Sequence, residues 1–418
     1  MPTKPKVVGE GTFGCVISPS LECADQDTDY TNKVSKVMYK RDADDETREY
    51  TKVDKADPQM KYHIGKPVQC IPTHRQMNII NDCEKFKANE INEYDILIME
   101  DGGDNLDTFV HRKGHTPQSI AQFWREARNV LEGLIMLKQH HLTHHDLKPQ
   151  NIVYKTHLKL IDFGKLVDQT ILKRDCMNSK NKRSRLHFNY PVELYYINRD
   201  KYMELTGLSV EDKESYIDEY IDEIYVKCPY LFKLIKPVKR EWFFSEIQYM
   251  IMKDLKSTNY NDFLQKTIEK IDVYGVGLSF SYVLQYFEGY MPEEIATRMR
   301  WLFKFAIHPN VFRRLTPETL LSKYDEIMNK WPVEKSSSEV SEKSVLPNTL
   351  SSSTHALSAV AEIELELPAP VPIPVSKECP PNKEWNPKTR RCNKKCGPKS
   401  HRNEQFKCVR NSTTKRKK

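Results

Sequence analysis

Residues 143–164 read THHDLKPQNIVYKTHLKLIDFG, and this stretch decides the fold. A loop ends at Asn151, and two short apolar segments follow it with a Lys-Thr-His turn between them. This pattern predicts a β-hairpin whose strand ends bring Asp146, Asn151 and Asp162 together. Two carboxylates and an amide are oxygen ligands that suit Mg²⁺, and they can also orient a hydroxyl. A buried hairpin with polar ends is the alternative, but it requires neither the Asp-x-Lys-x-x-Asn spacing at 146–151 nor Asp-Phe-Gly at 162–164.

The length and hydropathy of the chain limit the classes of protein to which it can belong. With 418 residues it can bury a large core and form two lobes with additional segments. No apolar run is long enough for a transmembrane helix. Because the first residues lead directly into a glycine-rich segment without an apolar signal core, we expect the protein to be made and kept inside a cell.

Charge is distributed unevenly along the chain. Residues 376–418 contain 15 Lys or Arg and 3 Glu, a balance of +12, so the total of +7 leaves −5 for residues 1–375. The basic tail suggests an anionic partner: nucleic acid, an acidic protein or a membrane surface. A solvated charged tail is the alternative interpretation.

The ten cysteines divide in the same way as the charge. The last four cluster at the C-terminus. The first six lack pair spacing, so for a cytosolic protein we expect free thiols there. These six are Cys15, Cys23, Cys70, Cys83, Cys176 and Cys228.

The N-terminal segment combines glycines with an inward-facing lysine. Residues 7–16 read VVGEGTFGCV, which predicts a strand, a tight glycine turn and a second strand. A dinucleotide fold would have a helix after the glycines, whereas here the second strand stops at Pro19. The next strand places Lys36 under the glycine turn, where nucleotide phosphates could neutralise it, and Lys33 is the less favoured choice.

Two further segments complete the central part of the chain. Residues 94–100, YDILIME, predict a buried strand, and Asp-Gly-Gly at 101–103 predicts a hinge. Residues 118–140 carry apolar side chains at 123, 127, 130, 131, 134 and 137, which is helical spacing. A core helix therefore leads directly into the stretch at 143–164.

In this order, the segments resemble those of a eukaryotic-type protein kinase over roughly residues 5–332. The resemblance implies an α+β, bilobal fold for a kinase domain at 1–332. It has a small β-rich N-lobe at about 1–100 and a large helical C-lobe at about 101–332. Residues 198–262 exceed the usual connection and predict a helical insertion, for which packing or docking are alternatives.

The resemblance also assigns roles in phosphoryl transfer from ATP. Asp146 accepts or orients the proton of the substrate hydroxyl, and Lys148 stabilises the transferred group. Asn151 and Asp162 hold Mg²⁺, and Lys36 contacts the α- and β-phosphates. Lys148 at its position resembles Ser/Thr kinases rather than Tyr kinases.

The resemblance further implies a glutamate partner for Lys36 on the helix that follows its strand. Within residues 44–53 we choose Glu49 over Glu46, because a tyrosine follows it and Val53 lies one turn on. The residues expected to line the nucleotide site are Val8, Gly9, Glu10, Gly11, Thr12, Phe13, Gly14, Val16, Lys36, Glu49, Met99 and Glu100.

One departure from the family concerns regulation. His145 replaces the usual Arg of the catalytic loop, so activation by a phosphate on the following segment is doubtful, and a protonated imidazole is the weaker substitute. The basic segment at 165–190 raises the hypothesis of acidic or phosphorylated substrates, with a solvated loop as the alternative.

Three residues of the large lobe receive structural roles from the resemblance. Glu193 is expected to pair with Arg314. Asp272 is expected to brace the backbone of the catalytic loop.

Composition changes after the kinase-like part. Residues 333–375 are rich in Ser and then in Pro, which indicates a disordered linker. The tail at 376–418 contains two imperfect repeats with cysteines 379, 392, 396 and 408. The first repeat resembles a two-cysteine adaptor module of large nucleocytoplasmic DNA viruses. Thiol or disulfide loops and a zinc site are both open for these cysteines.

The sequence thus predicts a protein serine/threonine kinase that uses ATP and Mg²⁺. The adaptor resemblance suggests a viral source of iridovirus or mimivirus type, located in the host-cell cytoplasm or packaged in the virion. A catalytically silent ATP-binding scaffold or structural virion protein is one alternative. A small-molecule kinase is another.

Overall fold

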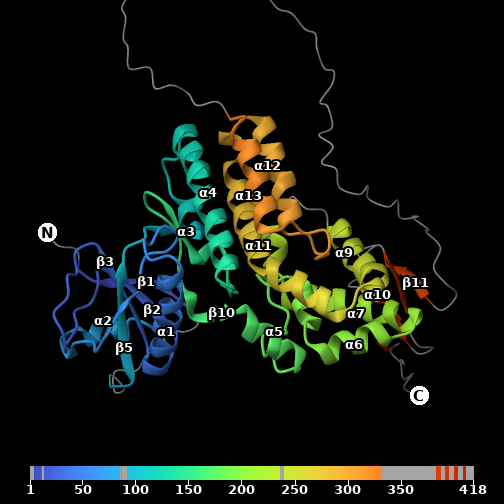
Figure 1. Ribbon diagram of the computed structural model, residues 1–418, viewed down its shortest axis with the longest axis horizontal. Coiled ribbons are helices and arrows are strands. Elements are labelled where there is room, and N and C mark those ends of the chain that lie inside the picture. The colour runs from blue at the N-terminus through green and yellow to red at the C-terminus, as the bar shows by residue number, and fades with distance from the viewer. Residues whose placement is uncertain are drawn as a thin grey trace, which may run out of the picture. The chain divides into compact units, whose positions relative to one another are not determined.

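A computed structural model describes residues 4–11, 14–84, 86, 92–235 and 240–331, and the backbone of four short strands between 383 and 410. The chain divides into two compact units, Met1–Ser336 and Ser337–Lys418. The first unit has two lobes, as predicted, with a β-sheet lobe followed by a helical lobe (Figure 1).

The N-lobe is an antiparallel sheet with the order β1-β2-β3-β5-β4. Strand β3 lies at the centre of this sheet. Its residue Lys36 is paired with Val16 on β2 and with Leu97 on β5. The bounds are β1 Lys6–Glu10, β2 Gly14–Ser18, β3 Lys33–Tyr39, β4 Val68–Cys70 and β5 Tyr94–Glu100. A short helical segment, His74–Gln76 and α2 Met77–Asn81, follows β4.

Helix α1, Lys40–Ala56, begins directly after β3. Its buried residues are Ala43, Glu46, Tyr50 and Val53, a spacing of three and four that defines one helix face. This face therefore carries a glutamate towards the interior of the lobe, next to the strand that carries Lys36.

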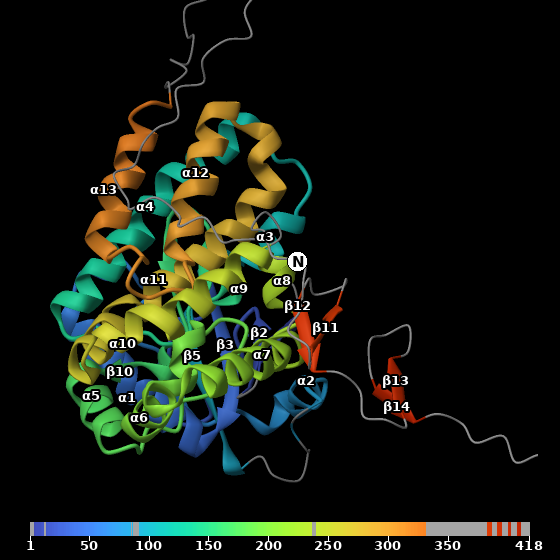
Figure 2. The same ribbon diagram turned by 90° about the vertical axis from the view of Figure 1, so that its right-hand side faces the viewer.

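The C-lobe is built around α4 and α11, two long buried helices. Helix α4, Pro117–Gln139, begins at a Thr116–Ser119 capping box, and the apolar positions expected from its periodicity are all buried. Helix α11, Tyr260–Phe287, is buried along most of its length. Figure 2 shows α12, Glu293–Ala306, and α13, Pro317–Met328, beside them.

Short strands and helices complete this lobe. Three strands form one sheet, β6 Asp104–Asn105, β8 Ile152–Tyr154 and β9 Leu158–Leu160, and two form another, β7 Leu142–Thr143 and β10 Val167–Asp168. Helices α3 Leu106–His111 and α5 Gln169–Met177 flank them.

The predicted insertion is helical: α6 Arg199–Gly207, α7 Val210–Lys227, α8 Leu231–Leu234, α9 Arg240–Tyr249 and α10 Leu255–Ser257. Its apolar faces belong to the same core as α11, which supports packing rather than docking as its role.

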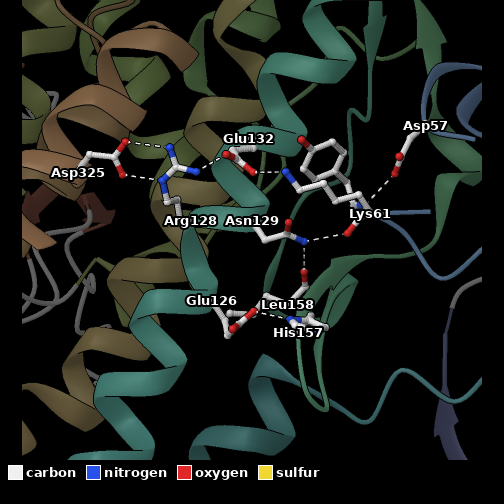
Figure 3. A network of polar contacts seen from close by, with 10 residues as sticks. Asp57, Lys61, Glu126, Arg128, Asn129, Glu132, His157, Leu158 and Asp325 are labelled. Carbon is white, nitrogen blue, oxygen red and sulfur yellow. Dashed lines mark hydrogen bonds and ion pairs between the residues drawn. The ribbon is translucent and has the colours of Figure 1, made fainter. Parts of the chain in front are cut away.

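Polar contacts join the two lobes behind the hinge (Figure 3). The Asn129 amide on α4 donates to the carbonyl oxygens of Lys61 and Leu158, both at 2.9 Å. The Leu160 N–H donates to the Tyr62 carbonyl at 2.8 Å. The loop after α1 is therefore fixed to the C-lobe at its backbone, which limits the positions that α1 can take.

The expectation of free thiols is wrong for four of the six N-terminal cysteines. Cys15 forms a disulfide with Cys83, and Cys23 forms one with Cys70. Strand β2 presents Cys15 to the lobe core, where Cys70 and Cys83 are also buried. The pairs are 68 and 47 residues apart in sequence, so only the sheet register reveals them. Cys176 and Cys228 are free and buried.

Reduction of these disulfides should destabilise the N-lobe. Each closes a long loop in the unfolded chain, so we expect dithiothreitol to lower the free energy of unfolding by about 2–4 kcal/mol for each bridge. Urea unfolding with and without reductant measures this. A variant with alanine at the four paired cysteines is the control, because reductant should not change its stability. Equal stability of the wild type in both conditions would contradict the pairing.

The second unit contains two hairpins. Strand β11, Lys383–Asn386, pairs with β12, Arg391–Lys394, and β13, Ser400–Arg402, pairs with β14, Cys408–Arg410. Two hairpins agree with two imperfect repeats, while the linker and the cysteine side chains of the tail lie outside the described residues. Among the described helices none has the length and hydropathy to span a membrane.

Candidate active site

The loop that carries Asp146 is held by a carboxylate of the central helix. Asp272 on α11 accepts hydrogen bonds from the backbone N–H groups of His144, at 2.7 Å, and His145, at 2.9 Å. His145 has a positive φ of 66°, a conformation that few side chains adopt without support. The bracing role predicted for Asp272 is confirmed.

The Asp146 carboxylate is buried, and hydrogen-bond donors surround it. Its Oδ1 atom accepts from Lys165 Nζ and from the Asn189 side-chain amide, both at 2.9 Å. Its Oδ2 atom accepts from Lys148 Nζ at 3.1 Å and from the Asn151 amide at 3.3 Å. Burial raises the pKa of Asp146, but the two ammonium groups outweigh it and hold the pKa at about 2. The carboxylate is therefore ionised at neutral pH.

Lys36 forms the second polar centre of the site. It pairs with Glu46 and not with the predicted Glu49. Its Nζ atom lies 2.6 Å from Glu46 Oε2 and 3.3 Å from Asp162 Oδ1. Although burial favours the neutral amine, these two carboxylates raise the pKa of Lys36. Glu49 instead pairs with Lys52 and Arg48 on its own helix.

The choice of Glu49 is wrong because Glu46, and not Glu49, lies on the buried face of α1. That face is formed by Ala43, Glu46, Tyr50 and Val53. Glu49 lies three residues further, about 4.5 Å along the helix axis from Glu46. The spacing of the buried residues was the signal that could have identified Glu46.

Substituting the two glutamates separately tests this correction. Glu46→Gln should lower kcat/KM for ATP by about 10- to 100-fold, because the negative charge that strengthens the hydrogen bond from Lys36 is lost. Glu49→Gln removes the same charge and is the matched control, with an expected change below about threefold because its partners lie on the helix surface. Initial rates at varied ATP concentration measure both, and the opposite ranking would reinstate Glu49.

Asn151 and Asp162 are suitably placed to hold a divalent cation. The Asn151 amide nitrogen donates to the Asp146 carbonyl at 2.8 Å, which leaves its amide oxygen as the ligand atom. Asp162 adopts a left-handed conformation, φ 62°, directly before the buried Phe163. The ring of Phe163 packs between Tyr50 and His144, so α1 and the catalytic loop both position Asp162. The carboxylate and amide oxygens fit Mg²⁺.

The glycine-rich turn lies at the edge of the same lobe. The Gly11 N–H donates to the Gly14 carbonyl at 2.8 Å, and Gly9 lies opposite Val16. A Cβ on Gly14 would approach the Val37 carbonyl oxygen to 2.1 Å, so this position requires glycine. Thr12 and Phe13 lie outside the described residues. The other nucleotide-site residues are on β1 and β2 or at the hinge, where Met99 and Glu100 end β5.

His145 does not act as a charged substitute for arginine. It is buried, and its ring lies edge-on to Tyr190 with the centroids 5.1 Å apart. Burial, with a further contribution from the positive charge of Arg183, lowers the pKa of His145 to about 3. In this structure the imidazole is therefore neutral and buried, which argues against the weaker alternative considered for regulation.

The segment after Asp162 returns to the catalytic centre at both of its ends. Lys165 and Asn189 contact Asp146, and sequence analysis missed both. Their only signals were the position of Lys165 directly after Asp-Phe-Gly and that of Asn189 before Tyr190. Further on, Glu193 forms a two-pronged ion pair with Arg314, at 2.6 and 3.0 Å, as predicted.

Comparison with known proteins agrees with this arrangement. Residues 3–180 match the model of the protein kinase domain. The bilobal kinase fold predicted from the sequence is confirmed. The chain is 28% identical to calcium-dependent protein kinase 24 of Arabidopsis thaliana over 164 residues, which are 38% of this chain and 25% of that protein.

Two further relatives are named as serine/threonine-protein kinases. One is serine/threonine-protein kinase ATG1a of Arabidopsis thaliana, 31% identical over 114 residues, or 26% of this chain and 17% of that protein. The other is serine/threonine-protein kinase ULK3 of Rattus norvegicus, 39% identical over 83 residues, or 19% of this chain and 17% of that protein. The chain thus spans about a quarter or less of the length of these relatives.

Proposed function

We propose that this chain is a protein serine/threonine kinase that uses ATP and Mg²⁺. The observation that carries the proposal is a pair of adjoining polar groups. Lys36, Glu46 and Asp162 are ion-paired, Asp146 contacts Lys148 and Asn151, and the charges of Asp146 and Lys148 act on Asp162. Each of these positions holds a chemically competent residue. The serine/threonine kinases among the similar proteins support the same class of acceptor.

The chain's own residues account for the main requirements of the reaction. Lys36, held by Glu46, binds and orients the ATP phosphates. Asp146 positions the acceptor hydroxyl and takes its proton as the new bond to the γ-phosphorus forms and the bond to the bridging oxygen of ADP breaks. Lys148 stabilises the transferred phosphoryl group. Mg²⁺, held by Asn151 and Asp162, would supply positive charge next to the phosphates.

Phosphate transfer from labelled ATP tests the proposal. The full chain would be incubated with Mg²⁺ and a mixed set of acidic and basic proteins, and the products analysed for phosphoserine, phosphothreonine and phosphotyrosine. Labelled phosphoserine or phosphothreonine is the expected product. ATP binding without transfer to any protein would favour the silent scaffold, and transfer only to sugars or aminoglycosides would favour a small-molecule kinase.

A separate proposal concerns the tail and the location of the protein. We propose that residues 376–418 bind a viral or host protein or a nucleic acid in the cytoplasm of an infected cell, with packaging in the virion as the alternative site. Its support is the net charge of +12 and the adaptor resemblance of the first repeat. Nucleic-acid binding that weakens steeply with salt and is lost on removal of 376–418 would identify the partner class. Salt-independent capture of a protein would instead indicate a protein partner.

A further inference from the structure

The Asp146 carboxylate has no free acceptor position for the hydroxyl of a substrate. An ionised carboxylate offers about four acceptor positions. In this structure Lys165, Asn189, Lys148 and Asn151 occupy them, each with one donor atom within 3.3 Å. An acceptor hydroxyl must donate to the same carboxylate before it can transfer its proton, so one of these donors has to leave.

Lys165 is the donor best suited to leave. Asn189 is a buried residue, and Asn151 is also fixed to the Asp146 backbone. Lys148 already has a role at the transferred phosphoryl group. Lys165, whose side chain is 22% exposed, has a long flexible chain and has no other ion pair among the described residues.

A displaced Lys165 would need another anion. Its ammonium lies 6.0 Å from the centre of the Tyr190 ring, and Lys148 shares the same carboxylate. Arg183, on the same segment, adds a further positive charge that acts on this centre. A part-buried ammonium next to other cations is unfavourable unless the arriving substrate supplies the negative charge.

We propose that Lys165 is an exchangeable counter-ion that pairs with Asp146 in the free enzyme and with an anionic group of the substrate during the reaction. The substrate class is then a serine or threonine with a carboxylate or phosphate-monoester side chain next to it in sequence. Lys165 is a positioning and specificity residue, and this inference rests on the proposed kinase activity. In this proposal, Lys165 Nζ is the atom that binds the anionic group of an acidic or phosphorylated substrate.

Peptide kinetics with the full chain test this assignment. One acceptor serine would be flanked by glutamate, by phosphoserine or by glutamine, and kcat/KM measured at saturating ATP. We expect the wild type to prefer each anionic peptide over the glutamine peptide by about tenfold or more, the usual worth of a charge-assisted hydrogen bond. Lys165→Gln should reduce this ratio to about one, and Lys165→Arg should retain most of it.

Lys180→Gln is the matched control, since it removes the same charge from the same segment at an exposed position. Its ratio should equal that of the wild type. A Lys165→Gln variant that slows all peptides equally, or changes only KM for ATP, would overturn the inference and leave the kinase assignment intact. A wild type without anionic preference would do the same. Absence of transfer to every peptide and protein would overturn the proposed function itself.

Discussion

Asp146→Asn should lower kcat by about 10²- to 10⁴-fold, the range that a positioned general base contributes. An amide of the same size keeps two polar atoms in place but cannot take the proton of the acceptor hydroxyl. It also loses the charge that holds Lys148 and Lys165. The turnover of saturating protein substrate with labelled ATP measures the loss.

Two controls separate lost chemistry from a lost fold. Asp175→Asn removes a carboxylate from the same segment. Asp175 forms its ion pair with the exposed Arg174, so this change should leave turnover within about twofold. ATP and Mg²⁺ should still raise the melting temperature of Asp146→Asn, since the residues that hold the nucleotide are unchanged. Retention of a tenth or more of wild-type turnover would remove Asp146 from the role of base.

The catalytic loop could be predicted from sequence because its chemistry is local. Asp146, Asn151 and Asp162 lie within 17 positions of one another, and the hairpin between them leaves little freedom in how they meet. The remaining positions depend on helix phase. Glu46 and Glu49 are three residues apart, and only Glu46 lies on the face that buries Ala43, Tyr50 and Val53. The side chains of Lys36 and Glu46 meet only once α1 has packed beside β3.

Long-range contacts were beyond the reach of local patterns. Cys15 and Cys83 become neighbours only once β2 has its place in the sheet. Asn189 reaches Asp146 only through the path of the segment that follows Lys165. Glu193 and Arg314 were paired correctly, although 121 residues separate them, because the family resemblance supplied the connection.

The second large expected effect concerns the buried ion pair of Glu193 and Arg314, and it is a loss of stability rather than of turnover. Glu193 and Arg314 have side chains that are both 0% exposed, and Arg314 also donates from Nε to the His308 carbonyl at 2.9 Å. Removing one partner leaves an uncompensated charge in the core. We expect Arg314→Met to lower the free energy of unfolding by about 3–5 kcal/mol, measured by urea denaturation.

Comparison with a surface pair shows whether burial is the cause. Arg298→Met breaks an ion pair with Glu294, whose side chain is 68% exposed, and should cost about 0–1 kcal/mol. If both variants lose the same small free energy of unfolding, the buried Glu193–Arg314 pair stabilises the protein no more than the surface pair does.

The double variant distinguishes loss of attraction from the cost of an isolated charge. Replacing Glu193 and Arg314 together by apolar residues leaves neither charge in the core, so it should cost less than the sum of the two single changes. Because Glu193 directly follows the segment that brings Asn189 to Asp146, the single variants should also lose turnover at temperatures where they remain folded. Folded single variants with wild-type turnover would show that the pair supports the lobe without positioning the catalytic centre.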